Sequence, residues 1–186
     1  NKNSAKLFDK QFSILKNINE SEKCEIFISF NQNEKSSLIS FCNTIETPDG
    51  GSHENGFKNG IIKAIKLYGQ KNQVSKISNI NINDLIDYSD IVISIFINEP
   101  SFEGQTKKRI IMPKLQKQLE TIIQNEFLLW LNSNKKITKN LIETLIERSL
   151  LRTDLTKIKE MERKSFKERH KLPGKLVDCS LSLIHI

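Results

Sequence analysis

Three apolar segments of strand length stand out in the first half of the chain. Cys24 to Phe30 and Ser36 to Asn43 run or alternate apolar, and the polar residues 31–35 between them suit a hairpin loop. We therefore expect an antiparallel pair of strands here. A third apolar run, from Ile91 to Ile97, predicts a buried strand later in the chain.

Between the second and third of these segments, the apolar residues recur at helical spacing. A turn cluster from Thr47 to Gly51 is followed by apolar residues at every third or fourth position up to Gly69, which indicates an amphipathic helix with a glycine stop. These positions are Phe57, Ile61, Ala64, Ile65 and Tyr68. A second, short helix fits residues 83–88. The predicted order β, β, α, α, β belongs to the α+β class.

The pattern is helical over a long stretch after the third strand. Pro113 suits the first position of a helix whose apolar face ends near Leu131, and the polar residues 132–136 break it. Thr138 fits the cap of a further helix, which loses its apolar face in the charged residues 157–171. A helix that fades in this way is typical of a connector.

Charge and cysteine usage narrow the picture only a little. The net charge of +7 favours an anionic partner, but it fits a solvated basic surface equally well. Cys24, Cys42 and Cys179 are widely spaced and lack a CxxC pair, so we expect neither a zinc site nor a disulfide framework. No apolar run approaches the roughly 18 residues that cross a bilayer, and we expect a cytoplasmic protein. Because the chain begins at Asn1 without a methionine, we also expect an internal fragment.

A polar, cationic segment from Phe102 to Arg109 follows the third predicted strand. A loop at this place projects from a rigid scaffold. Lys107 offers a mobile point charge, Gln105 offers an amide, and Gly104 permits a sharp turn, a set that suits contact with the terminal phosphate of a nucleotide. A solvated basic loop is the alternative, and the segment alone does not decide between them.

Three ordered segments resemble the B subunits of bacterial type IIA DNA topoisomerases, the family of DNA gyrase and topoisomerase IV. Residues 47–57, TPDGGSHENGF, resemble the family's glycine-glycine-threonine-histidine turn and helix, with Ser52 in place of threonine. Residues 105–107 are similar to its glutamine-threonine-lysine loop, and residues 172–179 to the start of its Toprim domain. The sequences of residues 45–49 and 126–132 are closer to topoisomerase IV than to gyrase.

The resemblance implies the fold and its divisions. The expected fold is a left-handed βαβ transducer domain followed by long connector helices. Residues 1–112 would be the transducer core, 113–171 its C-terminal helices and connector, and 172–180 the start of Toprim. The resemblance stops there, and residues 181–186 match one reading frame of a common transposase sequencing adaptor. We therefore interpret that tail as non-native.

The resemblance also implies a function, which is to couple ATP binding and hydrolysis to DNA strand passage. Gln105 and Lys107 would contact the γ-phosphate of ATP, Gly104 and Thr106 would support the loop, and Lys175 would lie near DNA. ATP and Mg belong to the full-length enzyme. The implied partners are DNA, the topoisomerase A subunit and a second B subunit held through the ATPase domain, in the cytoplasm at the nucleoid.

Within the chain itself we recognise no catalytic residue and no metal ligand, so we expect the isolated fragment to be inactive. His53, at the start of a predicted helix, is interpreted as a packing or capping residue, and Gly50 and Gly51 as a tight turn. Trp130 is expected in the core.

Other interpretations remain open. Within the family, the chain could come from the B subunit of DNA gyrase. A non-catalytic, basic nucleic-acid-binding βαβ module would need aromatic or glycine-rich base contacts, and the basic segments lack them. A helical interaction protein built on residues 113–170 explains neither the glycine turn nor the Gln105 loop.

Overall fold

The computed structural model describes residues 10–31 and 36–169, with side chains as far as residue 163. Within it the chain forms two compact units, the first ending at Ser149 and the second beginning at Leu150. Lys175, the expected start of Toprim and the expected tail lie outside the described residues.

A five-stranded mixed sheet forms the first unit together with its helices. The spatial order of the strands is β1, β2, β5, β3, β4. Their bounds are β1 Phe12–Asn17, β2 Lys23–Phe30, β3 Ser37–Cys42, β4 Ile45–Glu46 and β5 Ser89–Phe96. β5 is antiparallel to β2 and parallel to β3.

The prediction that the first two apolar segments form a hairpin is wrong. β2 and β3 do not pair, because β5 lies between them, and Ile91 of β5 is the register partner of both Ile28 and Leu38. The three isoleucines of β5 that face the core are fully buried, as a central strand requires. The hairpin partner of β2 is β1, a strand that the sequence pattern did not predict.

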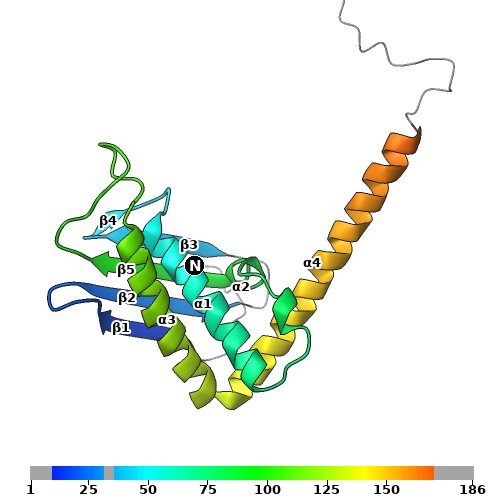
Figure 1. The fold of residues 1–186 in the computed structure, drawn as a ribbon, viewed down its shortest axis with the longest axis horizontal. Helices are drawn as coiled ribbons and strands as arrows, with labels where there is room; N and C mark the ends of the chain where they lie inside the picture. The colour runs from blue at the N-terminus through cyan, green and yellow to red at the C-terminus, as the bar shows by residue number, and fades with distance from the viewer. Residues whose placement is uncertain (1–9, 32–35, 170–186) are drawn as a thin grey trace, which may run out of the picture. The chain divides into compact units, whose positions relative to one another are not determined.

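Two long helices cover one face of the sheet (Figure 1). They are α1, Ser52–Lys71, and α3, Pro113–Ser133. The connection from β3 through α1 to the parallel strand β5 makes a βαβ unit. With the helices in front of the sheet and β5 pointing to the left below β3, this crossover is left-handed (Figure 1). That hand is the rare one, and it agrees with the expectation drawn from the resemblance.

α1 and α3 run side by side in the same direction, in very close contact. A Cβ atom added at Gly56 would lie 2.7 Å from the carbonyl oxygen of Gln116, and one at Gly60 would lie 2.8 Å from that of Glu120. The two glycines therefore form notches that admit the backbone of α3. At the far end of α3, Trp130 stacks on Phe127 with ring centroids 5.6 Å apart; it was expected in the core, and it is partly buried against the edge of the core.

Short elements and a third long helix complete the chain. They are η1 Ile77–Asn79, α2 Asn83–Ile86 and α4 Lys135–Arg169. Thr138 does not cap α4 as expected, because the helix begins at Lys135 and the Thr138 hydroxyl donates instead to the carbonyl oxygen of Leu131, at 2.8 Å. Arg148 lies over the ring of Tyr88, with its guanidinium carbon 3.5 Å from the ring centroid.

The second unit contains the remainder of α4, from Leu150 onward. Leu151, Leu155, Ile158 and Met161 of this unit are exposed, whereas most large apolar side chains of α1 and α3 are buried or partly buried. No helix in the described part of the chain is long and apolar enough to span a membrane.

Candidate functional site

The loop between β5 and α3 closes on itself at its base. Phe102 and Ile110 form an antiparallel bridge, and the amide of Glu103 donates to the carbonyl oxygen of Arg109 at 2.8 Å. We call residues 101–103 and 109–112 the stem, and residues 104–108 the tip. The stem thus presents the tip as a short, closed projection.

The stem is hydrogen-bonded along its length to the turn before α1. The amide of Ile110 donates to the carbonyl oxygen of Gly50 at 3.1 Å, and the carbonyl oxygen of Ile110 accepts from the amide of Ser52 at 2.9 Å. The Ser52 hydroxyl oxygen accepts from the amide of Met112 at 2.7 Å, and at the border with the tip the Asp49 amide donates to the carbonyl oxygen of Lys108 at 3.1 Å. Two segments that the sequence analysis treated separately therefore form one structure.

Glycine at position 51 is what allows this contact. Its φ of 131° and ψ of −150° lie in a region that other residues rarely adopt. A Cβ atom there would lie 2.2 Å from the carbonyl oxygen of Ile110, which no side chain can do. Gly50 has a φ of 64°, and its Cβ would collide with the Glu54 carboxylate. The expected structural use of both glycines is confirmed.

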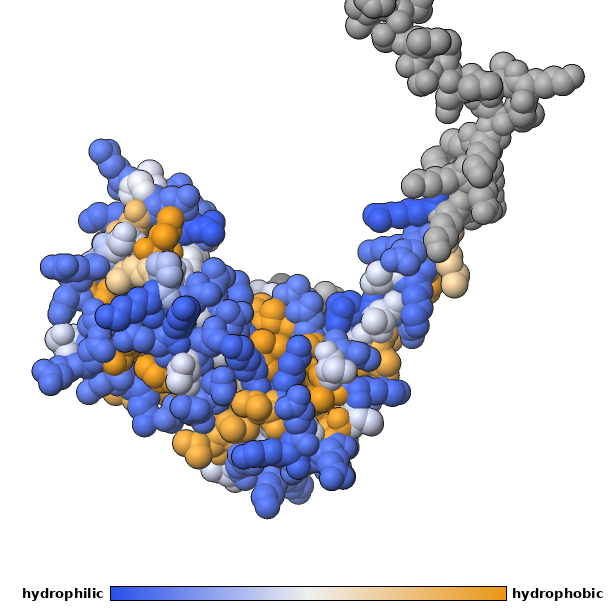
Figure 2. Space-filling model, viewed as in Figure 1, coloured by the Kyte–Doolittle hydropathy of each residue, from blue (hydrophilic) through white to orange (hydrophobic). Residues whose placement is uncertain are grey.

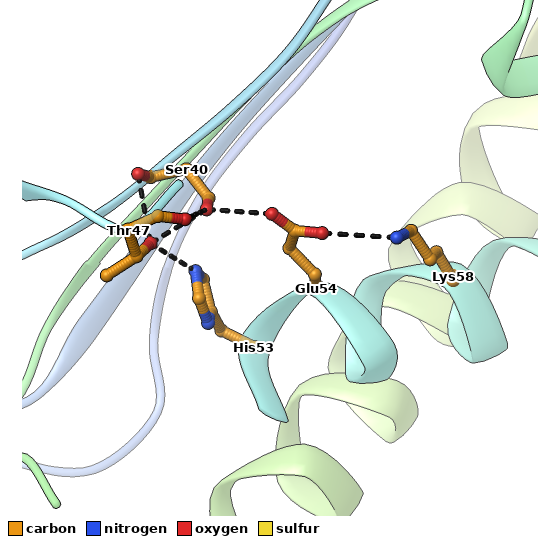
Figure 3. Close-up of polar contacts among 5 residues, drawn as sticks. All are labelled: Ser40, Thr47, His53, Glu54 and Lys58. Carbon is orange, nitrogen blue, oxygen red and sulfur yellow. Dashed lines mark hydrogen bonds and ion pairs between the residues drawn. The ribbon is translucent and has the colours of Figure 1, made fainter. Parts of the chain in front are cut away.

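A small polar network lies beneath the turn (Figure 3). The Ser40 hydroxyl, on β3, donates to Glu54 at 2.8 Å, and Lys58 donates to the other Glu54 oxygen at 3.1 Å. The Thr47 hydroxyl donates to the carbonyl oxygen of Ser40 at 3.0 Å and forms a hydrogen bond of 3.1 Å with Nε2 of His53. This network joins the turn and the first turn of α1 to the sheet.

His53 is fully buried, and that burial decides its chemistry. Desolvation lowers its pKa from 6.5 to about 4, with a smaller raising effect from Glu54 and a lowering effect from Lys58. The imidazole is therefore neutral near pH 7. Its Nδ1 atom has no hydrogen-bond partner in the described part of the protein. A buried, neutral ring of this kind packs and holds Thr47, which confirms the interpretation of His53 as a packing residue.

The tip differs from the stem in exposure and charge. Gly104 has a φ of 76° with nothing within 4 Å of where its Cβ would lie, and Lys107 has a φ of 55°. Gln105, Thr106 and both lysines of the tip are exposed. Arg109 at the base pairs with Glu103 at 3.4 Å, whereas no ion pair within the described residues engages Lys107 or Lys108. The tip therefore offers uncompensated positive charge to an anion.

Other chemistry is sparse in the described residues. They contain no group of three or more His, Cys, Asp or Glu side chains that could hold a metal ion. Cys24 and Cys42 are buried free thiols, and desolvation raises the pKa of each to about 11. Hydrophilic residues predominate around the loop after β5, whereas hydrophobic residues gather near the middle and bottom of the same face (Figure 2). The loop is thus the described site best suited to a charged ligand.

Comparison with known proteins gives this geometry a context. The sequence model described as DNA gyrase B matches residues 1–161. The chain belongs to the DNA gyrase B family. Within this family it is similar to the B subunit of DNA topoisomerase 4 from Rickettsia felis, with 39% identity over 159 residues. The match covers 85% of this chain and 24% of that protein.

Two further relatives extend the comparison. The B subunit of DNA gyrase from Halalkalibacterium halodurans is 33% identical over 159 residues, covering 84% of this chain and 25% of that protein. The solved topoisomerase IV ATP-binding domain of Francisella tularensis, in complex with a small-molecule inhibitor, aligns with a TM-score of 0.70 at 30% identity. That alignment covers 78% of this chain and 40% of that one. The chain thus spans about a quarter of the length of the two curated relatives from Rickettsia felis and Halalkalibacterium halodurans.

Proposed function

We propose that this chain is the transducer part of the B subunit of an ATP-dependent type IIA DNA topoisomerase, closer to topoisomerase IV than to gyrase. The curated topoisomerase IV relative described above is more similar in sequence than the gyrase relative, at 39% against 33% identity. The whole enzyme would act in the cytoplasm on DNA, together with an A subunit and a second B subunit. Lys175 would lie close to that DNA.

The observation that carries this proposal is the union of the glycine turn with the loop stem. The hydrogen bond from the Met112 amide to the Ser52 hydroxyl joins residues 60 positions apart in the chain. Ser52 is the first residue of α1, and Met112 directly precedes α3. A displacement of the tip would therefore reach the starts of both long helices through the hydrogen bonds of the stem.

Lys107 and Gln105 would contact the γ-phosphate of ATP bound to the ATPase domain of the whole enzyme, where Mg would supply further positive charge. Lys107 supplies a charged donor, and Gln105 supplies an amide donor. Gly104 and Thr106 would set the shape of the tip. Donors held in place before charge develops lower the barrier to phosphoryl transfer. Loss of the γ-phosphate would remove their partner and release the tip.

The test compares Lys107→Ala with Lys108→Ala in the intact enzyme. A hydrogen bond to a charged group is worth about 1.5–3 kcal/mol, so loss of the Lys107 contact slows ATP hydrolysis by about ten- to a hundredfold. The two lysines are neighbours, carry the same charge and are both exposed, which makes Lys108→Ala a matched control. We expect it to leave hydrolysis nearly unchanged.

DNA affinity, measured over a range of salt concentrations, separates the alternatives. Equal and small effects of both substitutions on hydrolysis, with equal weakening of DNA binding, would show that the tip is only a basic surface. A selective loss of hydrolysis at Lys107 with preserved DNA affinity supports the phosphate contact.

A further inference from the structure

The second unit displays an unbroken row of apolar side chains that no described residue covers. Leu151, Leu155, Ile158 and Met161 are 63%, 58%, 52% and 68% exposed. Their spacing of four, three and three residues puts them on one side of α4. We call these four residues the connector stripe. Exposed, contiguous apolar surface of this kind marks an interaction site.

The spacing of Leu151, Leu155 and Ile158 matches the seam of a two-stranded coiled coil, and Met161 falls at the flanking g position. With Leu155 at position a of a heptad, Leu151 and Ile158 fall at the d positions on either side of it. These three side chains make consecutive core layers. The helix is already formed through this stretch, since α4 is continuous from Lys135 to Arg169. Pairing therefore does not have to overcome the cost of nucleating a helix.

The charges that flank the stripe indicate what covers it. In the same heptad, Asp154 takes position g on one flank and Lys159 takes position e on the other. In a parallel pair of identical helices, each g residue meets the e residue five positions further along the partner. Asp154 would then face the partner's Lys159, and the reciprocal pair would form as well. An antiparallel pair would instead bring like flanks together.

An ion pair within the chain does not oppose this arrangement strongly. Lys157 lies 3.3 Å from Asp154, but the two side chains are 67% and 65% exposed. Exposed pairs of this kind contribute little, so Asp154 can exchange partners at small cost.

We propose that the connector stripe pairs with the same stripe of a second copy of this chain, in parallel and in register. This inference does not depend on the role of the Gln105 loop. Three core layers form an interface well below the roughly 1,200 Å² at which stable complexes begin. The contact is therefore weak and transient, and it forms fully where two copies are already held close together.

Disulfide crosslinking measures such a weak contact in the whole purified chain. Cys179→Ser is introduced throughout, while Cys24 and Cys42 are buried and stay in place. Leu151→Cys and Ile158→Cys are made singly, with Glu160→Cys as the matched control on the opposite side of the same exposed helix. Because pairing raises the local thiol concentration, we expect Leu151→Cys and Ile158→Cys each to dimerise about tenfold faster than Glu160→Cys.

The direction of pairing follows from the same variants. Equal rates at all three positions would measure random collision only and would overturn the proposal. Rapid crosslinking only between Leu151→Cys and Ile158→Cys in a mixture would mean antiparallel pairing and would also overturn it. Helix content, measured by circular dichroism, confirms that each variant is folded.

Charge reversal tests the register. In the Leu151→Cys chain, Lys159→Glu places like charges opposite each other and slows crosslinking, and adding Asp154→Lys restores it. Lys157→Glu changes the net charge equally but lies off both flanks, so it serves as the control. Absence of rescue by the double reversal would rule out the parallel register.

Discussion

The stem and the tip of the loop after β5 are adjacent in sequence and physically opposite. Ile110 in the stem is 1% exposed and exchanges hydrogen bonds with Gly50 and Ser52. The tip is exposed from Gly104 to Lys108, and its two lysines have no ion-pair partner in the described chain. The stem therefore fixes the position of the loop, and the tip carries the exposed side chains that can bind a ligand. Substitutions in the stem and in the turn on which it docks should therefore lower stability more than substitutions in the tip.

The largest effect is expected from Gly51→Ala. The new methyl group would collide with the backbone of Ile110 at a φ that alanine disfavours. We expect the free energy of unfolding of the purified chain to fall by about 3 kcal/mol or more. Urea denaturation, followed by circular dichroism, measures this. A loss no greater than that of Gly104→Ala would contradict the proposed close contact.

The second prediction concerns His53, which belongs to the polar network at the turn on which the stem docks. The pKa of His53 is lowered from 6.5 to about 4 in the folded chain, so between these values the unfolded chain binds a proton that the folded chain does not. Stability therefore falls as the pH falls. Between about pH 7.5 and pH 5 this group removes about 2 kcal/mol.

His53→Gln tests this by its slope rather than by its overall stability. The variant has no titrating group at the position, so its free energy of unfolding should depend less on pH over that interval. Parallel curves for the two proteins would show that His53 is not buried in its neutral form.

A smaller effect is expected from Gly104→Ala at the tip. The backbone there is left-handed, with a φ of 76°, but the space around it is open. Only the conformational cost remains, which is about 1 kcal/mol. The same urea titration measures it, and a loss as large as that of Gly51→Ala would mean that the tip is packed and not exposed.

The smallest effect on stability is expected from Lys107→Ala. The side chain is exposed and has no ion-pair partner within the described residues, and alanine keeps the same backbone preference. We expect a change within about 0.5 kcal/mol. A clear loss of stability would show that Lys107 supports the fold, and it would make any loss of hydrolysis uninterpretable as a phosphate contact.

Periodicity predicted the elements that bury one face against a near neighbour. The apolar spacing of α1 and α3 and the apolar run of β5 were enough, because burial along one element leaves a local trace. β1 was not predicted, since only Phe12 and Ile14 mark its inner side strongly. The hairpin between β2 and β3 was wrong because neighbours in sequence were assumed to be neighbours in the sheet.

The residues of the candidate site were predicted from the sequence, but the contacts that position them were not. Gly104, Gln105 and Lys107 were recognised from their side-chain chemistry and from the family resemblance. The docking of the stem that carries them on the glycine turn depends on hydrogen bonds between positions about 60 residues apart, such as Met112 to Ser52. Those bonds use backbone atoms and a common serine hydroxyl, which leave no distinctive pattern in a single sequence. The hydrogen bond from Ser40 to Glu54 joins two common polar side chains from different elements, and it leaves no distinctive pattern in the sequence either.

The place of β5 in the middle of the sheet has a consequence for folding during synthesis. Among the strands of the described residues β5 comes last in sequence, yet it joins the pair β1 and β2 to the pair β3 and β4. Its contacts span long stretches of chain, as between Ser37 and Asp90, 53 residues apart, and such non-local contacts form slowly. Until residue 96 has left the ribosome, the described strands β1 to β4 can form only two separate hairpins with open edges.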